Sequence, residues 1–229
     1  MTHTSDSPDR ERLELDCGGR TWRLERVADL EALWDQMTEG DFGEDDRLPY
    51  WAELWPASLA LVEHLGRVRA RIAGRACLDL GCGLGLTAIA GALHGARVLG
   101  MDYELDALRH AARNADLNLD QAGPPPLWAL MDWRAPGVRP GSIECLWAGD
   151  ILYEKRFIEP VADFLDHALA PDGVAWLAGP ERRVHQPFGE HMASLGFARK
   201  KVLTNHAVFP FHSGQGPLVK INIWELRRR

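Results

Sequence analysis

The stretch Leu78-Asp-Leu-Gly-Cys-Gly-Leu-Gly-Leu86 decides the fold prediction for this chain. It begins as an apolar strand with one acidic residue, Asp79, and passes directly into a glycine-rich turn. Gly81, Gly83 and Gly85 allow backbone conformations that other residues rarely adopt, and they let a ligand lie against bare main chain. The residues from 87 to 94 continue as an apolar helix. The pattern predicts a strand, loop and helix that bind a nucleotide-type cofactor.

The spacing of the acidic residue and the glycines separates two cofactor classes. A dinucleotide site usually has G-x-G-x-x-G, but counted from Gly81 its last position is Leu86. Asp79 instead completes D-x-G-x-G-x-G, which resembles the first motif of S-adenosylmethionine (SAM) methyltransferases. SAM has an ammonium group and no pyrophosphate, so a nearby carboxylate favours it electrostatically. We therefore expect SAM to be bound by Asp79, Gly81, Cys82 and Gly83, and an NAD oxidoreductase is the least supported alternative.

A second acidic residue ends the next apolar strand, over residues 97–102. A carboxylate at this strand tip, Asp102, can accept hydrogen bonds from both ribose hydroxyls of the cofactor. Tyr103 beside it can cover the adenine ring. Asp102 can also cap the helix expected over 104–118, and the two roles are compatible.

Length and composition limit the remaining possibilities. The 229 residues, 46% of them hydrophobic, suffice for one well-buried α/β domain. The formal net charge of −7 argues against a nucleic-acid partner, which would require a basic surface. No signal-peptide core or bilayer-length apolar run is visible, so we expect a soluble cytoplasmic protein with no membrane partner. The four cysteines form no C-x-x-C pair, which predicts free thiols and no structural metal.

Strand and helix patterns alternate from residue 77 onward, which predicts a doubly wound parallel sheet. The expected strands cover 77–80, 97–102, 127–131, 143–149 and 173–178, and the expected helices cover 87–94, 104–118, 156–169 and 185–195. Two final strands, 198–205 and 217–226, have no helix between them and should form an antiparallel hairpin. This α/β seven-stranded, mostly parallel sheet with an antiparallel C-terminal hairpin resembles the fold of class I SAM methyltransferases.

The chain ahead of this unit has a different pattern. Apolar residues alternate on both sides of Gly18-Gly19, as is typical of a β-hairpin, and then recur at helical spacing from Leu30 to Met37. We therefore expect an N-terminal appendage of hairpin and helix over residues 1–46 and a SAM-dependent methyltransferase domain over residues 47–229.

Two further motifs narrow the resemblance. Pro49-Tyr-Trp-Ala-Glu-Leu-Trp-Pro-Ala57 looks like the W-P-A/G segment of the lysine-directed seven-strand methyltransferases, a family that includes the electron-transfer-flavoprotein lysine methyltransferase. Pro56 suits the first turn of the helix that follows. The resemblance implies that Trp55 contacts the cofactor and that Trp51 and Glu53 lie in the substrate pocket. Taken alone, the two tryptophans are also typical of core packing.

The second motif, Trp147-Ala-Gly-Asp-Ile-Leu-Tyr153, resembles the D-x-x-Y element of the same family. Ligands of open α/β sheets bind outside the carboxyl ends of the strands, which is where Asp150 is expected. The resemblance implies that Asp150 and Tyr153 are catalytic and that Gly149 lies beside the cofactor. A helix-capping aspartate and a packed tyrosine would give the same four-residue pattern.

Two other segments extend the resemblance. Leu130-Met-Asp-Trp-Arg134 is similar to a family segment that places an acid and an indole around adenine, which implies cofactor roles for Asp132 and Trp133. Leu177-Ala-Gly-Pro-Glu-Arg182 has an equivalent that varies among relatives, and it is a candidate for shaping substrate choice.

These motifs together predict methyl transfer from SAM to an amine. A lysine amine has an ordinary pKa of roughly 10.4, so the pocket must lower that pKa by desolvation or remove the proton. Aromatic walls can desolvate the amine, and Asp150 can orient it. The resemblance favours a protein-lysine N-methyltransferase. Two alternatives stay open: a small-molecule N-methyltransferase, and a noncatalytic SAM-binding protein, against which the Asp150-to-Tyr153 element counts.

Overall fold

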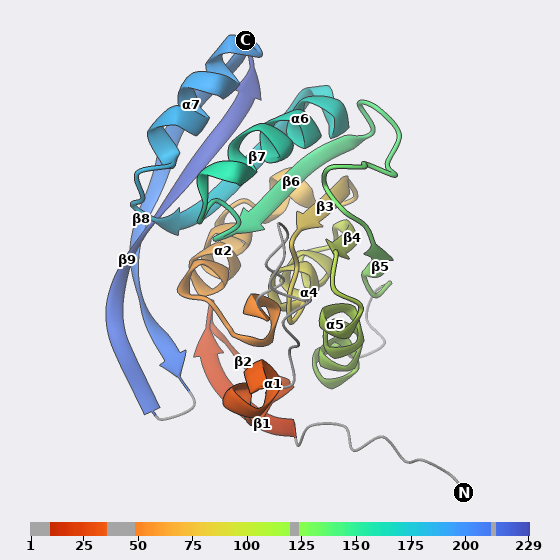
Figure 1. The fold of residues 1–229 in the computed structure, drawn as a ribbon. Helices are drawn as coiled ribbons and strands as arrows, with labels where there is room; N and C mark the ends of the chain where they lie inside the picture. Colours follow the sequence, from red (N-terminus) through yellow and green to blue (C-terminus); the bar gives the residue numbers. More distant parts are fainter. Residues whose placement is uncertain (1–9, 36–48, 120–123, 212–213) are drawn as a thin grey trace, which may run out of the picture.

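The computed structural model describes residues 10–35, 49–119, 124–211 and 214–229. In this part of the chain a two-stranded hairpin lies beside a seven-stranded sheet with helices on both faces (Figure 1). The hairpin consists of β1 (Arg10–Cys17) and β2 (Arg20–Val27), as predicted, and α1 (Leu30–Asp35) follows it. The predicted boundary between residues 46 and 47 lies outside the described residues, as does Met37.

The strands of the large sheet are β3 (Ala76–Leu80), β4 (Arg97–Asp102), β5 (Leu127–Leu130), β6 (Ile143–Gly149), β7 (Leu169–Pro180), β8 (Phe197–Phe211) and β9 (Gly214–Arg228). The helices are α2 (Pro56–Arg67), α3 (Arg69–Ile72), α4 (Leu86–Leu93), α5 (Leu105–Asn118), α6 (Ile158–Ala168) and α7 (His185–Ser194), with short 3₁₀ turns η2 (Tyr50–Ala52) and η3 (Lys155–Phe157).

The sheet order is β5-β4-β3-β6-β7-β9-β8. The strands from β5 to β7 pair in parallel, and β9 pairs antiparallel with both β7 and β8. The predicted doubly wound α/β sheet with an antiparallel C-terminal hairpin is therefore confirmed.

The C-terminal hairpin is longer than the sequence predicts. Pairing of β8 with β9 continues to Phe211 and Gly214, far beyond the last partner pair of β7 and β9, Pro180 and Ile221. The glycines and prolines of this stretch suggested a loop, but a register shift between Val208 and Pro210 accommodates them within the ladder.

Alternating residues of the central strands fill two cores on opposite faces of the sheet. Trp147 of β6 belongs to the core beneath α2 and α4, whereas its neighbour Leu146 belongs to the core beneath α6 and α7. A Cβ atom on Gly91 of α4 would lie 2.7 Å from the Trp147 ring. Only glycine at position 91 therefore lets α4 pack this closely on the sheet. Because α4 begins at the glycine-rich loop, this packing also positions the loop.

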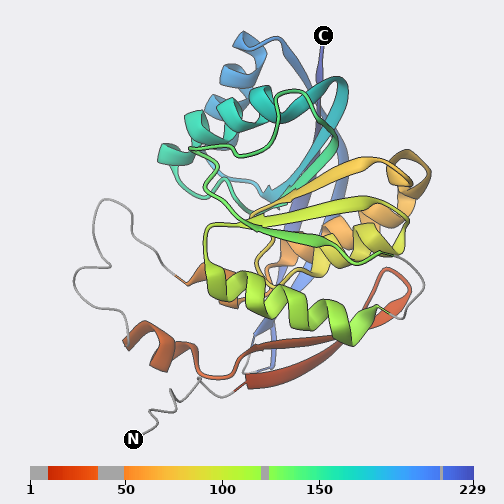
Figure 2. The ribbon, with the colours of Figure 1, turned by 90° about the vertical axis from the view of Figure 1, so that its right-hand side faces the viewer.

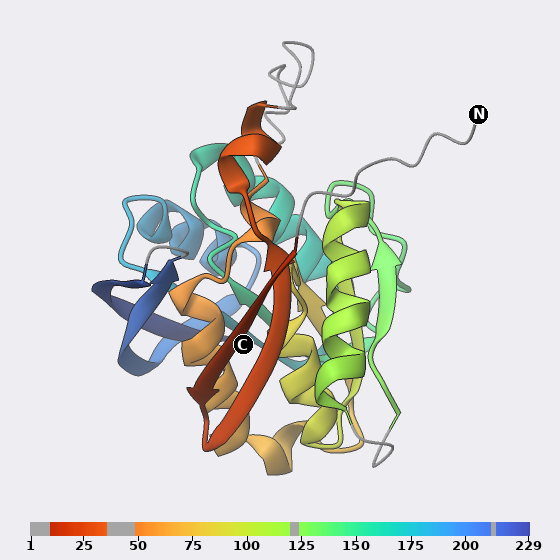
Figure 3. The ribbon, with the colours of Figure 1, turned by 90° about the horizontal axis from the view of Figure 1, so that it is seen from below.

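The N-terminal hairpin is fixed to the main body through α5. Trp22 and Leu24 of β2 join the hydrophobic core beneath α2 and α4. Two asparagine side chains of α5, Asn114 and Asn118, pair with the free backbone edge of β2. Figures 2 and 3 show the hairpin running beside α5, with α2 on its other side in Figure 3.

Candidate functional site

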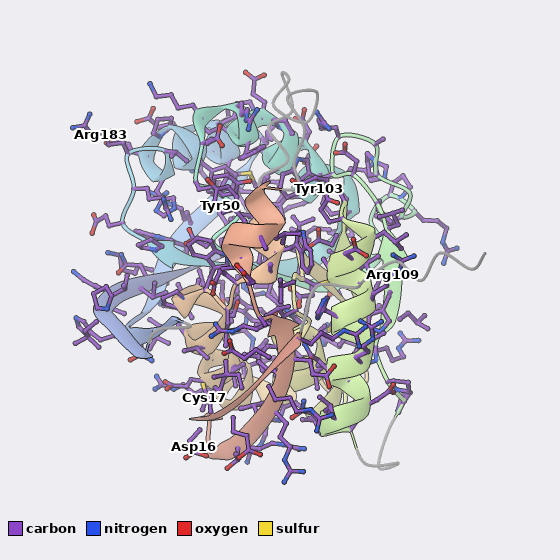
Figure 4. All side chains as sticks on the ribbon, turned by 60° about the horizontal axis from the view of Figure 1, so that its bottom comes forward. Asp16, Cys17, Tyr50, Tyr103, Arg109 and Arg183 are labelled. Atoms are coloured by element: carbon purple, nitrogen blue, oxygen red, sulfur yellow. The ribbon has the colours of Figure 1, made fainter. Side chains whose placement is uncertain are left out.

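A cavity of about 340 Å³ opens beyond the carboxyl ends of β3, β4 and β6, a volume within the usual range for small-molecule sites. Figure 4 shows two of its lining residues, Tyr50 and Tyr103, in the upper half of the view, away from the Asp16–Cys17 end of the hairpin at the bottom. All but two of the residues predicted for the site line this cavity: Trp51, Glu53, Trp55, Gly81, Cys82, Gly83, Asp102, Tyr103, Trp133, Gly149, Asp150 and Tyr153.

The glycine-rich loop has the conformation that its glycines suggest. Gly81, Gly83 and Gly85 have φ values of 68°, 50° and 83°, in the left-handed region. The backbone N–H groups of Gly81 and Cys82 both donate to the Met101 carbonyl at 2.9 Å. The loop is thus tied to the end of β4 and forms one wall of the cavity.

Asp102 lies at the tip of β4 as predicted, and its carboxylate is buried. It accepts hydrogen bonds from the backbone N–H of Gly83 at 2.9 Å and from that of Glu104 at 3.1 Å. Burial raises the pKa of Asp102, and these backbone donors oppose the rise. The helix cap itself is Glu104. The Tyr103 backbone also bonds to this carboxylate. A carboxylate has about four acceptor positions, so Asp102 retains capacity for a further hydroxyl donor.

Asp79, which we expected to contact the cofactor, does not lie among the cavity-lining residues. It is 1% exposed and accepts a hydrogen bond from Thr87 Oγ1 at 2.6 Å. The reason is the alternation of side chains along β3, which turns Asp79 toward α4 rather than toward the edge of the sheet. Burial raises its pKa to about 7. Its observed contacts connect β3 to the first turn of α4.

Asp132 also lies outside the cavity lining, although its neighbours Met131 and Trp133 line it. Its carboxylate accepts the backbone N–H of Arg134 at 2.8 Å and pairs with the Arg134 guanidinium at 2.7 Å. After β5 ends, successive side chains point in opposite directions, so the acid faces outward and the indole inward. The predicted adenine contact of Asp132 is not supported by this placement, whereas Trp133 is suitably placed.

An aromatic wall follows the cavity from its Trp55 end to its Tyr103 end. Successive ring centroids lie 4.8 to 6.4 Å apart, mostly in edge-to-face orientation, in the order Trp55, Tyr50, Tyr153, Phe157, Trp133 and Tyr103. Burial raises the pKa of Tyr153 well above its ordinary value, so its phenol stays neutral at pH 7. Sequence reasoning missed Tyr50, which lines the cavity and lies inside the motif that contains Trp51 and Trp55. It also missed Phe157, which is not among the lining residues and packs against Tyr153 and Trp133.

Asp150 follows the end of β6 in a conformation that is rare for a residue with a side chain, with φ of 54°. Its backbone N–H donates to the Ala178 carbonyl at 2.8 Å. Its Oδ2 accepts a hydrogen bond from Arg182 Nη2 at 3.0 Å. Burial raises the pKa of Asp150, and the Arg182 charge opposes this rise. Arg182 also lines the cavity. It belongs to the segment 177–182 that the sequence marked as a candidate for shaping substrate choice, although Arg182 itself was not predicted as a site residue.

Glu53 is held on the cavity wall by the N-terminal hairpin. Arg26 of β2 lies within 3.3 Å of Glu53 Oε2 and within 2.9 Å of Glu11 Oε1, and its side chain is 1% exposed. A buried guanidinium is stable only when its charge is paired, so these carboxylates and Arg26 fix one another's positions.

In the part of the chain that the structure describes, no group of three or more His, Cys, Asp and Glu side chains is arranged as a metal site. No helix there has the length and apolarity to span a membrane. The four cysteines are free thiols, and Cys17 is only half-buried.

Comparison with known proteins gives sequence relatives among methyltransferases. The family model of ribosomal protein L11 methyltransferase (PrmA) matches residues 58–125. The chain is 29% identical over 143 residues to the electron transfer flavoprotein beta subunit lysine methyltransferase of Danio rerio, covering 62% of this chain and 53% of that protein. It is 28% identical over 186 residues to EEF1A lysine methyltransferase 3 of Mus musculus, covering 80% and 75%. The chain thus spans about half the length of the flavoprotein methyltransferases it matches.

Solved structures show the same fold at low sequence identity. The 16S rRNA N2 G1207 methyltransferase RsmC of T. thermophilus aligns with a TM-score of 0.62 at 16% identity, covering 96% of this chain and 51% of that one. Magnesium protoporphyrin IX methyltransferase of Synechocystis, solved with bound SAM, aligns with a TM-score of 0.59 at 20% identity, covering 81% and 83%. The comparisons confirm the class I methyltransferase fold and the resemblance to protein-lysine methyltransferases.

Proposed function

We propose that this chain, which has the class I methyltransferase fold and resembles protein-lysine methyltransferases in sequence, is a SAM-dependent N-methyltransferase that methylates a lysine side chain of a protein. The observation that carries the proposal is one cavity lined by two sets of groups with different chemistry. The glycine loop, Asp102 and Tyr103 form the set that we assign to the cofactor, and Asp150 and Tyr153 form the set that we assign to the acceptor. We refer to these two sets as the cofactor end and the acceptor end of the cavity.

The cofactor end suits SAM. The loop packs closely against the other cavity walls because its residues are glycines: a Cβ atom on Gly81 would approach Ile151 Cγ2 to 3.0 Å, and one on Gly83 would lie 3.4 Å from the Trp51 carbonyl oxygen. We assign a ribose hydroxyl to Asp102 and the adenine ring to Tyr103 and Trp133. When bound, SAM supplies an electrophilic methyl group on a sulfonium ion.

The acceptor end suits an amine. The aromatic wall excludes water from the acceptor, which favours the neutral form of a lysine amine. A neutral nitrogen forms the new N–C bond with its lone pair, the electrons of the C–S bond leave with sulfur, and the resulting ammonium releases a proton to solvent. Tyr153 contributes a neutral hydroxyl, and we assign Asp150 to orienting the amine.

A protein acceptor is favoured over a small molecule by the sequence relatives, two kinds of which are named as protein-lysine methyltransferases. The acidic composition, with a formal net charge of −7, favours a protein over a nucleic acid as the partner.

Mass spectrometry of a cell extract incubated with the purified full chain and isotopically labelled SAM tests the proposal. Label on a protein lysine is the expected result and would identify the substrate. Label confined to a small amine would overturn the protein-lysine assignment, and absence of label despite measurable SAM binding would overturn the enzymatic one.

Variants at the two ends of the cavity separate binding from turnover. Asp102→Ala should weaken SAM binding in calorimetry, whereas Asp132→Ala, which removes an acid outside the cavity, should leave it unchanged. Asp150→Ala should lower kcat by roughly tenfold or more with SAM affinity nearly intact. An unaltered dissociation constant in Asp102→Ala would remove the ribose assignment, and unaltered turnover in Asp150→Ala would remove the catalytic one.

A further inference from the structure

Arg182 brings a positive charge to the acceptor end of the cavity from an element far along the chain. It follows the end of β7 and precedes α7, and its Nη2 lies 3.0 Å from Asp150 Oδ2. The Arg182 side chain is 34% exposed and lines the cavity, whereas the Asp150 side chain is only 7% exposed. The guanidinium is therefore the more accessible member of the pair.

The Asp150 carboxylate depends on this contact. Its second oxygen, Oδ1, is buried and makes no hydrogen bond with the described residues. Removing a carboxylate from water in this way costs a large desolvation free energy unless a nearby cation compensates it. The backbone of Asp150 is in the left-handed region, so the chain holds the side chain toward the end of β7 at a conformational cost.

We infer that Arg182 is a positioning residue of the acceptor site, which keeps the buried Asp150 carboxylate ionised and fixed and makes the pair electrically neutral toward the incoming amine. The inference rests on the proposed function. An isolated carboxylate would stabilise the ammonium form of the acceptor, which has no lone pair for attack. The guanidinium offsets that effect while the carboxylate stays in place.

Other ionisable groups surround the pair from neighbouring elements: His185 of α7, Arg199 of β8, Glu181 beside Arg182, Tyr153 and Glu154 after β6, and Glu53 after η2. Burial lowers the pKa of His185 to about 4, and the charges of Arg182 and Arg199 act in the same direction. His185 is therefore neutral near pH 7 and does not replace Arg182 as a counter-charge.

Carbon NMR of protein labelled at the aspartate carboxyl carbons tests the inference without a methyl acceptor. The Asp150 signal is assigned by its loss in Asp150→Asn. Arg182→Gln should raise the titration midpoint of Asp150 by about 1 to 3 pH units, because a neighbouring cation shifts a carboxyl by that amount. Arg182→Lys should retain most of the wild-type midpoint. Arg183→Gln is the matched control, since Arg183 is exposed and projects outward (Figure 4).

The pH dependence of methyl transfer gives the second readout. In Arg182→Gln the acidic limb of the kcat/KM profile should move to higher pH, because the Asp150 carboxyl and the acceptor amine both lose their protons at a higher pH than in the wild type. Activity should therefore recover partly in alkaline buffer. SAM affinity should stay within about twofold of wild type. Arg182→Met, which retains the aliphatic stem, serves if the glutamine variant does not fold.

The outcomes separate the inference from the proposed function. An unchanged Asp150 midpoint in the neutral variants, or an equal loss of activity at every pH, would overturn the positioning role. A shifted midpoint in a protein that transfers no methyl group would support the ion-pair argument and reject the proposed function on which the inference depends.

Discussion

Replacing Asn114 with alanine should destabilise the protein and also weaken SAM binding. Asn114 is fully buried on α5. Its Oδ1 accepts the Glu25 backbone N–H at 2.6 Å, and its Nδ2 donates to the carbonyl oxygens of Glu25 at 3.1 Å and Leu84 at 2.9 Å. The first two bonds hold the N-terminal hairpin, and the third holds a residue of the glycine loop that lines the cavity. One amide therefore couples the hairpin to the cofactor site.

The magnitude follows from the bonds lost. A buried hydrogen bond contributes about 0.5–1.5 kcal/mol net, so three bonds correspond to a loss of about 1.5–4.5 kcal/mol in the free energy of unfolding. The bond to Leu84 alone, at about 1 kcal/mol, corresponds to a loss of about fivefold in SAM affinity if the loop must be ordered to bind.

Asn118 provides a matched control on the same helix. It is also buried, and its side chain makes three bonds, to the N–H and carbonyl of Arg23 and to the carbonyl of Asn114, but none to the glycine loop. Urea denaturation should show similar losses of stability for Asn114→Ala and Asn118→Ala, whereas calorimetry should show weakened SAM binding for Asn114→Ala alone. Equal SAM affinities in the two folded variants would refute the coupling.

Two further substitutions test the loop and the acid beneath it. Gly85→Ala should lower the free energy of unfolding by at least about 2 kcal/mol more than Gly196→Ala. Both residues have φ near 84°, but only a Cβ atom on Gly85 would meet a neighbour, Ala111 Cβ at 2.7 Å. Equal losses of stability in the two variants would contradict this steric argument. Burial raises the pKa of Asp79 to about 7 from an ordinary 3.8, so its contribution to stability is complete below about pH 4 and is lost as the pH rises toward 7. Denaturation of wild type and Asp79→Asn across this range should show the variant gaining relative stability with pH, and a constant difference would remove Asp79 as the titrating group.

The parts of the site that lie within one strand, its loop and the following helix were predictable from sequence. The glycine loop and Asp102 belong to such units, where the carboxyl edge of a parallel sheet fixes where the loop residues lie. The D-x-x-Y element was predictable for the same reason, and Asp150 and Tyr153 reach the same cavity. Repeated strand and helix periods likewise gave the order of elements, although pairing within the C-terminal hairpin extends past the residues that the pattern marks as strand.

The cations that pair with the buried acids of the site were not predictable, although the segment 177–182 that contains Arg182 was marked as a candidate for substrate choice. Arg26 comes from the hairpin and Arg182 from the connection after β7, and each compensates a carboxylate that a sequence motif had marked, Glu53 and Asp150. A lone arginine carries no local pattern, since its partner is decided by how strands far apart in sequence pair. The motif therefore indicates where a buried acid lies, and the tertiary structure decides which cation neutralises it.

The two asparagines of α5 form a sequence pattern that indicates a docked strand. Asn114 and Asn118 are four residues apart on the buried face of an amphipathic helix, where an amide is costly unless both its N–H and its C=O find partners. An unpaired strand edge offers such partners at alternate residues, and β2 presents them at Arg23 and Glu25. Two buried amides at this spacing are thus better explained by a docked strand edge than by isolated core positions. The hairpin edge and the two amides of α5 therefore satisfy one another's hydrogen-bonding groups, and each stabilises the other's position.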